Sequence, residues 1–401
     1  MELKWRKQLK MPLSRRVKDL NPSSTLQITS LANKLRAEGV DLVSFGAGEP
    51  DFDTPDFIKE AAIEAIRKGF TKYTPSTGTA ELKKAIQEKF KKENNLNYST
   101  EQIVVSSGAK HCLFNIILSV LDDGDEAIIP VPYWVSYPEM VKAAGGVSRF
   151  ALTEAGNNFK LTPADFKKLV NPRSRLLILN SPANPTGCVY AKEELGALAE
   201  ICVKNKIYII SDEIYEKLIY DGLRHVSIAA LSDEAEQLTF TVNGVSKSYA
   251  MTGWRIGYFA GPLEIVNAIK NLQDHSTSNP CSISQKAAFA ALSASGDSVQ
   301  EMRKEFEKRR DYFIRRMDSI PSLSYIRPQG AMYLFCNISK TGLTSGDFAL
   351  RLLKEEKVAL IPGDSFGCND YIRLSFATDI KTIEKGIDRL EKWLKQLPKK
   401  F

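Results

Sequence analysis

The sequence predicts an α/β fold, with a large domain whose mostly parallel β-sheet is sandwiched by helices and a smaller α+β domain. Three observations predict it. The chain has 401 residues, too many for one small core. Short β-branched apolar runs alternate with amphipathic helical stretches, a pattern typical of βαβ units. A long charged helical stretch at 298–317 then opens a region of different style.

Six apolar runs are expected to be strands of the large sheet, and they read as continuous hydrophobic segments because such a sheet is buried on both faces. They are residues 103–106, 127–130, 176–180, 207–211, 238–242 and 256–260. The intervening helical stretches include 81–93 and 192–205.

Shorter strands are expected within 331–338 and 370–377. We therefore expect three segments. Residues 1–50 form an N-terminal arm and part of the small domain, 51–297 form the large domain, and 298–401 form the small C-terminal domain.

The composition narrows the class of protein. The net charge of +7 is modest, and six basic residues between positions 4 and 16 supply much of it. It therefore does not call for a nucleic-acid partner. The basic N-terminal segment lacks the apolar core of a secretory signal, and no apolar run reaches membrane-spanning length. We expect a cytoplasmic protein with no membrane partner.

Cysteine and histidine usage limits the chemistry. Six scattered cysteines without a C-x-x-C pair indicate reduced, intracellular thiols. Three histidines and no H-E-x-x-H motif argue against a metal site or a histidine dyad. Lysine, tyrosine, aspartate or a cofactor must then carry any proton transfer.

Ligands of open α/β sheets bind beyond the carboxyl ends of the strands, so the loops after each predicted strand are informative. Ser107 to His111 open a helix and could present N–H groups to an anion, although an ordinary strand-to-helix turn explains them as well. Trp134 could stack on a planar ligand, but taken alone it reads as a core residue. Asn184, in a rigid Pro- and Gly-containing turn, could cap that turn or face a ligand.

The next two loops carry charges. Asp212 ends an apolar strand, where a carboxylate is costly unless it meets a cation, although it could simply cap a helix. Tyr215, three residues on, could face the same site. Lys247 follows another strand, and a desolvated lysine becomes a usable amine. Arg255 begins the last predicted strand of this sheet.

Nucleotide-binding motifs are not supported. The segment 46–51 breaks the G-x-G-x-x-G pattern, and there is no G-x-x-x-x-G-K-[ST]. One cofactor, pyridoxal 5′-phosphate, accounts for the whole set of residues. It needs a lysine for its aldehyde, a carboxylate for its ring nitrogen, a stacking partner, and an arginine with a helix N-terminus for its phosphate.

Taken together, the motifs resemble the class I, fold-type I pyridoxal-phosphate-dependent aminotransferases. The bacterial aspartate aminotransferase subgroup, which includes aspartate/prephenate aminotransferases, is the most similar. The resemblance runs from about Ser14 to the C-terminus, which would leave no room for an added DNA-binding domain. Its motifs are GAGEPDFDTP, KYTPSTGTAELK, PYWVSYPEMV, NSPANPTG, SDEIYEKLIYDG, SKSYAMTGWRIGY and YIRLSFA.

The resemblance implies the catalytic roles. Lys247 would bind the aldehyde covalently and move the proton between the substrate Cα and the cofactor. Asp212 would pair with the ring nitrogen, and Tyr215 and Asn184 would bind the 3-oxygen. Trp134 would stack on the ring. The phosphate would be held by Arg255, Ser107, Gly108 and Ala109, with Ser246 also at the cofactor.

The resemblance also implies the substrate contacts. Arg373 would bind the α-carboxylate, helped by Asn184 and the Gly48 backbone. Lys110 and Thr25 would bind the distal carboxylate of an acidic substrate. Tyr73 would reach the neighbouring subunit's cofactor, so a homodimer is expected.

One position departs from the family. Many relatives have a hydroxyl residue three positions before the lysine, where this chain has Gly244, so one phosphate contact could be missing or replaced.

The expected activity is ping-pong transamination between an acidic amino acid, such as aspartate, and a 2-oxo acid such as 2-oxoglutarate or prephenate. A pyridoxal-dependent β/γ-lyase on the same fold is the alternative enzyme, and a non-catalytic ligand sensor is the alternative outside enzymes.

Overall fold

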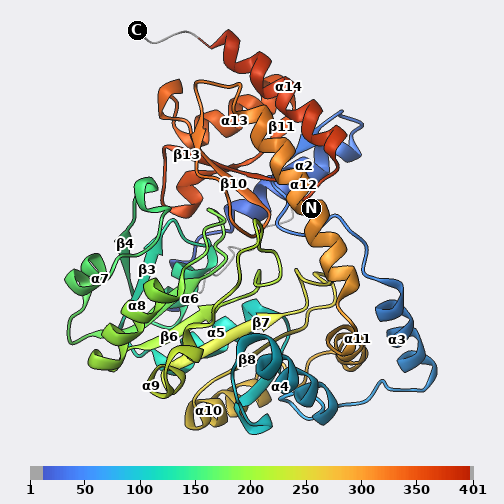
Figure 1. The fold of residues 1–401 in the computed structure, drawn as a ribbon, viewed down its shortest axis with the longest axis vertical. Helices are drawn as coiled ribbons and strands as arrows, with labels where there is room; N and C mark the ends of the chain where they lie inside the picture. Colours follow the sequence, from blue (N-terminus) through green and yellow to red (C-terminus); the bar gives the residue numbers. More distant parts are fainter. Residues whose placement is uncertain (1–11, 398–401) are drawn as a thin grey trace, which may run out of the picture.

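A seven-stranded sheet forms the centre of the structure, a computed structural model that describes residues 12–397 (Figure 1). Within these residues its neighbouring strands are parallel, except that β8 runs antiparallel to both β2 and β7. The strands lie in the order β2 (Ile103–Ser106), β8 (Gly257–Ala260), β7 (Thr239–Gly244), β6 (Tyr208–Asp212), β5 (Ser174–Asn180), β3 (Glu126–Val131) and β4 (Val147–Leu152).

Alternating side chains of the central strands enter two separate apolar cores. In β5, Leu176 and Ile178 face one core, whereas Leu177 and Leu179 face the other, because successive side chains of a strand point to opposite faces. The first face is covered by α5 (Ala109–Val120), α6 (Ser136–Ala143) and α10 (Leu263–Asp274). The second is covered by α7 (Pro163–Leu169), α8 (Lys192–Asn205), α9 (Asp233–Glu236), α3 (Asp56–Arg67), α4 (Ala80–Asn94) and α11 (Ser282–Ser293).

A second, antiparallel sheet gathers the C-terminal part of the chain above the first, in the orange and red region of Figure 1. Its strand order is β12 (Ile361–Pro362), β13 (Tyr371–Ser375), β10 (Tyr333–Asn337) and β9 (Ser324–Tyr325). The helices of this region are α12 (Asp297–Met317), α13 (Ser345–Glu356) and α14 (Ile380–Gln396). The N-terminal strand β1 (Val43–Ser44), which follows α2 (Ser24–Ala37), pairs in parallel with β11 (Val358–Ala359).

The short 3₁₀ turns complete the elements. They are η1 (Thr100–Gln102), η2 (Ala155–Asn157), η3 (Ile228–Leu231), η4 (Ser339–Thr341) and η5 (Gly363–Phe366).

The predicted α/β class with a mostly parallel sheet is confirmed, and the six predicted strands begin and end within two residues of the observed ones. The prediction missed β4. This strand lies at the edge of the sheet and buries only Ala151, so it lacks the apolar run that marked the others. The division of the chain at residues 51 and 298 stays a prediction.

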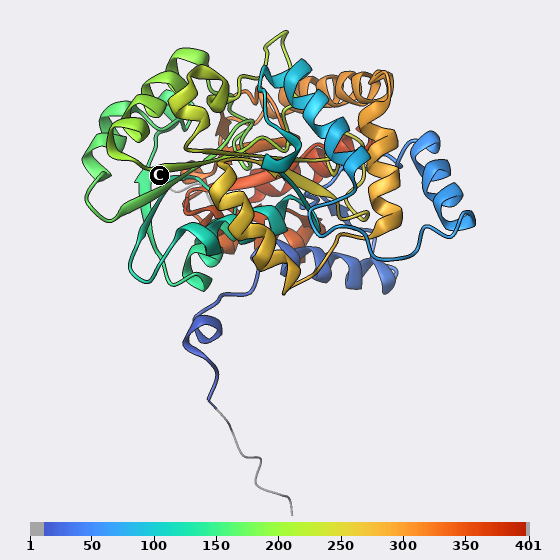
Figure 2. The same ribbon diagram turned by 90° about the horizontal axis from the view of Figure 1, so that it is seen from below.

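The expectations for residues 1–11 lie outside the described part of the chain. Residues 12–20, which include α1 (Arg15–Lys18), project from the main body (Figure 2). Among residues 12–397, no helix is both long and apolar enough to cross a membrane. The six cysteines, all within this range, are unpaired.

Two helical glycines should respond to the same substitution with opposite signs. A Cβ on Gly386 of α14 would stand 2.3 Å from Phe45 Cζ, whereas a Cβ on Gly196 of α8 would meet nothing within 4 Å. Gly386→Ala should lower the free energy of unfolding by about 1–3 kcal/mol through overpacking. Gly196→Ala should raise it by about 0.5–1 kcal/mol through helix propensity. Thermal denaturation of both variants tests this, and equal shifts would contradict the packing at Phe45.

Candidate active site

A cleft of about 440 Å³ opens where the carboxyl ends of the central strands meet the second sheet. This is the edge at which open α/β sheets bind ligands. Its lining includes twelve of the fifteen predicted site residues. They are Thr25, Gly48, Ala109, Lys110, Trp134, Asn184, Asp212, Tyr215, Ser246, Lys247, Arg255 and Arg373.

Asp212 is the last residue of β6, and its carboxylate is buried. It accepts hydrogen bonds from the Tyr137 hydroxyl at 2.6 Å and from the Ile214 N–H at 3.3 Å. Burial raises the pKa of Asp212 to about 6, because these two neutral donors only partly replace water. Asp212 therefore caps a turn and also presents an acidic group to the cleft.

Lys247 follows β7 and is half-buried, with its ammonium directed across the cleft. Its Nζ donates to the Gly48 carbonyl at 2.5 Å and lies 5.9 Å from the centroid of the Tyr215 ring. Burial lowers the pKa of Lys247 to about 8. The neutral amine, which is the nucleophilic form, is thus brought close to physiological pH.

Arg255 lies against the start of α5. Its guanidinium donates to the Ser107 carbonyl at 3.3 Å and to the Thr252 carbonyl at 3.0 Å. Gly108, with φ of +91°, makes this approach possible, because a Cβ there would stand 2.3 Å from Arg255 Nη2. The cation and the N–H groups of Ala109 and its neighbours thus form one cradle for an anion.

Asn184 and Arg373 meet on the opposite wall. Arg373 Nη1 donates to Asn184 Oδ1 at 2.9 Å and its Nη2 donates to the Gly46 carbonyl at 3.1 Å. The Arg373 Nε is buried without a partner in the described part of the chain. Because a buried donor without an acceptor is costly, this guanidinium is suited to a carboxylate ligand. The Asn184 side chain faces the cleft and does not cap its own turn.

Trp134 is half-buried and contributes a ring face to the cleft. Lys110 Nζ lies 4.8 Å from the centroid of that ring. Burial lowers the pKa of Lys110, and the nearby Arg255 lowers it further. Thr25, from α2, also lines the cleft, so the N-terminal segment contributes to it.

Four predicted positions lie apart from the cleft lining: Ser107 and Gly108, which contact Arg255 behind it, and Tyr73 and Gly244. Tyr73 is 91% exposed and does not line the cleft of its own chain. Gly244 ends β7, where a Cβ would stand 3.1 Å from Gly257 Cα on β8. A larger residue at 244 would require these strands to move apart by a few tenths of an ångström.

The sequence reading missed five polar residues that line or support the cleft. They are Glu49, Tyr137, Asn180, Thr252 and Tyr333. Tyr137 carried the only usable signal, since its spacing of three from Trp134 could place both on one face of a helix. Tyr333 lies in a strand of the other sheet, and its approach to the cleft depends on how the two sheets are assembled.

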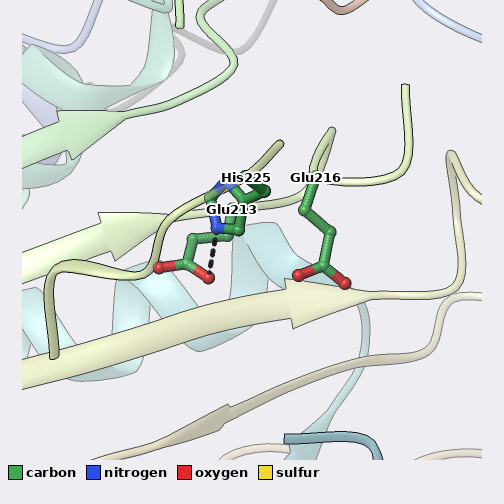
Figure 3. A group of neighbouring side chains, drawn as sticks. All are labelled: Glu213, Glu216 and His225. Carbon is green, nitrogen blue, oxygen red and sulfur yellow. Dashed lines mark ion pairs between the residues drawn. The ribbon is translucent and has the colours of Figure 1, made fainter. Parts of the chain in front are cut away.

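A buried polar network anchors the turn between Asp212 and Tyr215 from behind. Figure 3 shows His225 directed at Glu213 with Glu216 beside them; His225 Nε2 is 2.8 Å from Glu213 Oε2. The Asn94 amide donates to Glu213 at 3.2 Å and to Glu216 at 2.8 Å. Lys89 Nζ contacts Glu216 directly. The turn that carries the cleft residues is thereby tied to α4.

The three side chains Glu213, Glu216 and His225 bring ligand atoms within 4.8 Å of one another, as a metal site would. Here Lys89 and Asn94 supply the positive charge and the donors. Burial opposes ionisation of Glu216, yet Lys89, His225 and Lys217 lower its pKa to about 2. Burial lowers the pKa of His225, but Glu213 and Glu216 outweigh it and the net shift is upward. The cluster is a charge-balanced structural network.

The fold and the lysine-, carboxylate- and arginine-lined cleft define an α/β enzyme, and comparison with known proteins specifies its family. The family model described as "Aminotransferase class I and II" matches residues 40–390. The chain is 49% identical to an aspartate aminotransferase of Bacillus sp. (strain YM-2), over 96% of this chain and 100% of that protein. It is 48% identical to a probable aspartate/prephenate aminotransferase of Aquifex aeolicus, over 96% and 99%.

Solved structures that resemble this chain belong to aspartate aminotransferases as well. The aspartate aminotransferase of Rhizobium meliloti superposes with a TM-score of 0.93 at 39% identity, covering 97% of this chain and 100% of that one. The Thermus thermophilus aspartate aminotransferase with maleate gives a TM-score of 0.92 at 42% identity, with 96% and 100% covered. The chain belongs to the class I and II aminotransferase family and is an enzyme of the aminotransferase type.

Removing the cation of the buried network should destabilise the protein strongly. Lys89→Met removes the cation in direct contact with the buried Glu216 carboxylate, so the free energy of unfolding should fall by about 3–5 kcal/mol. Lys92→Met, on the same helix but with a 74% exposed side chain, is the matched control and should change it by less than about 0.5 kcal/mol. Chemical denaturation of both variants is the measurement. Similar losses would rule out Lys89 as the counter-ion.

The buried Asp212 should make the unliganded protein less stable at high pH. A carboxyl whose folded-state pKa is raised contributes stability that is present below about pH 4 and is lost as the pH rises through 6. Asp212→Asn should therefore raise the free energy of unfolding by roughly 3 kcal/mol at pH 8 and by about half of that at pH 5.

Thermal denaturation of the unliganded variant and wild type at both pH values checks this. Tyr137→Phe removes a donor to the same carboxylate and should destabilise more at pH 8 than at pH 5. A difference between Asp212→Asn and wild type that did not change with pH would exclude a raised pKa at Asp212.

Proposed function

We propose that the chain catalyses pyridoxal-phosphate-dependent, ping-pong transamination between an acidic L-amino acid and a 2-oxo acid. The observation that carries the proposal is the convergence of Lys247, Asp212 and Arg255 on one cleft from three different strand ends. Family membership supports transamination over the alternative β/γ-lyase.

The residues present fit this cofactor. The cradle formed by Arg255, Gly108 and the start of α5 is suited to a phosphate, since a side chain at 108 would fill it. Asp212, a buried carboxylate whose pKa is raised by burial and whose hydrogen-bond donors are neutral, is suited to a protonated ring nitrogen. The bound cofactor would supply an aldehyde and an electron-accepting ring.

The catalytic roles follow from these positions. Lys247, with its lowered pKa, would bind the aldehyde and afterwards hold and return the proton at its Nζ. Asp212 would hold the positive charge on the ring nitrogen. Tyr215 and Asn184 would donate to the 3-oxygen, and Trp134 would pack against the ring. Ser246, Ser107 and Ala109 complete the proposed cofactor site.

Substrate recognition would divide between two walls. Arg373, with its unpaired Nε, and Asn184 would bind the α-carboxylate beside the Gly48 backbone. Lys110 and Thr25 would bind the distal carboxylate. A substrate without that carboxylate would leave the Lys110 charge unpaired, which disfavours apolar amino acids.

The names of relatives guide the choice of substrate. Those already cited are described as acting on aspartate and, in one case, aspartate and prephenate. A structure 41% identical over 91% of this chain is described as an aromatic aminotransferase. We infer aspartate as donor, 2-oxoglutarate as acceptor, and prephenate as a second acceptor.

The proposal includes a homodimer. Tyr73, 91% exposed on one chain, would contact the phosphate of the neighbouring subunit's cofactor. We further infer the cytoplasm as the location, and a large and a small domain divided near residues 51 and 298.

A half-reaction tests the function directly. Aspartate added to the cofactor-loaded protein should abolish the visible absorption band, and 2-oxoglutarate, oxaloacetate or prephenate should restore it. Order-of-addition spectra measure both steps. Release of ammonia and pyruvate from an amino acid with a leaving group on Cβ, such as cysteine, without any acceptor and with no loss of the band on adding aspartate, would contradict transamination.

Lys247→Ala provides the control. This variant should bind the cofactor without the covalent bond and lose on the order of 10³-fold or more in rate. Its thermal denaturation should stay close to that of wild type. Turnover at the normal rate would remove the central assignment.

A further inference from the structure

Tyr333 is a fully buried residue of the cleft that the proposed function does not use. It begins β10, and its ring packs on Arg373, whose Cζ lies 4.3 Å from the ring centroid. In the sheet register, Phe335 is opposite Arg373 and Tyr333 is opposite Ser375. Tyr333 and Arg373 are thus diagonal neighbours on one face, within reach of each other.

The Tyr333 hydroxyl is hydrogen-bonded to the hydroxyl of Tyr215, at 2.8 Å. The two rings meet edge to face, with centroids 5.8 Å apart. Tyr215 belongs to the large-sheet side of the cleft and Tyr333 to the second sheet. Gly48 lies beside the Tyr333 hydroxyl, since a Cβ at position 48 would stand in ordinary contact with that oxygen, at 3.7 Å.

Each hydroxyl has one proton, so only one of the two can donate within the pair. We propose that Tyr333 is a positioning residue that donates to Tyr215, so that the Tyr215 proton remains available to the cleft. Resting on the proposed function, this makes Tyr215 a stronger donor to the 3-oxygen of the cofactor, because hydrogen bonds in a chain polarise one another.

The charges around the pair favour this direction. Arg373 packs directly on the Tyr333 ring and makes the Tyr333 O–H more acidic; Arg373 also acts on Tyr215, but there the negative charge of Asp212 opposes it. Burial is the main cause that raises the pKa of both hydroxyls; the hydrogen bond between them raises the pKa of Tyr215 further and lowers that of Tyr333. Lys247 over the Tyr215 ring and Glu49 on the Tyr333 side are the other charged groups that act on the pair. The stronger acid of a hydrogen-bonded pair is the donor.

The arrangement also links the carboxylate site to the cofactor site. A carboxylate bound at Arg373 would neutralise the cation beside Tyr333 and weaken its donation. Tyr215 would then donate less strongly to the 3-oxygen. Occupancy of the substrate site would therefore be transmitted to the cofactor through Arg373, Tyr333 and Tyr215.

The test is the pH titration of the visible absorption band of the holoenzyme. Donation to the 3-oxygen stabilises its negative charge, and so lowers the pH at which the lysine-linked nitrogen loses its proton. Tyr333→Phe should raise the midpoint by about 0.3 pH unit, and Tyr215→Phe should raise it further. Tyr371→Phe, on the neighbouring strand β13, should leave it unchanged.

Maleate, a dicarboxylate without an amino group, tests the link to Arg373 in the wild-type protein. It should raise the midpoint, and the rise should be smaller in Tyr333→Phe. Tyr333→Phe keeps the ring on Arg373, so its KM for aspartate should stay within about twofold of wild type. Tyr333→Leu removes the ring and should raise KM.

The sign of the shift decides the direction of the bond. A lower midpoint in Tyr333→Phe would mean that Tyr215 donates to Tyr333, and an unchanged midpoint would mean that the hydroxyl pair is without effect; either result overturns the proposal. Absence of any pH-dependent band in the wild-type holoprotein would instead overturn the proposed function, and this inference with it.

Discussion

The rest of the cleft depends on one constraint, the burial of the Asp212 carboxylate at the end of β6. Behind it, Lys89 contacts Glu216, and His225 Nε2 lies 2.8 Å from Glu213 Oε2. Asp212 differs, because the Tyr137 hydroxyl and the Ile214 N–H that donate to it are neutral, and Lys247 acts on it only from a distance. A cationic group that binds in the cleft can therefore stabilise the charge of Asp212.

The alternation of apolar runs and helices identified the central sheet because its strands are buried on both faces. Strand β4 was not predicted, because an edge strand that buries only Ala151 has no continuous apolar run. The prediction of the site was limited in the same way, because a local sequence pattern cannot show which distant segments meet. Residues at the ends of successive strands were found together, since a parallel sheet aligns those ends. Tyr333 and Glu49 were not, because they lie outside those strand ends; Gly48 and Arg373, from the same regions, were predicted only through the family resemblance.

The role of a single residue could not be decided from the sequence, because one side chain can have both a structural role and a ligand-binding role. Asp212 accepts the Ile214 N–H, as a capping residue does, and also faces the cleft. Trp134 packs within an apolar core and still presents a ring face to the cleft. No reading of single residues could decide such cases, since one side chain serves both purposes. The geometry of the whole cleft is what separates them.

The charge of the cleft argues for an anionic occupant. Four basic side chains line it in the described residues, Lys110, Lys247, Arg255 and Arg373, against two acidic ones, Glu49 and Asp212. Burial lowers the pKa of both lysines and raises that of Asp212, so each of these groups is shifted towards its neutral form. A negatively charged ligand group beside Lys110 would raise the pKa of that lysine again, and its attraction to the ammonium would contribute to binding. Such a cleft attracts dianions more strongly than monoanions, because the field of several cations converges in it. A phosphate at Arg255 and a dicarboxylate between Lys110 and Arg373 would together meet that demand.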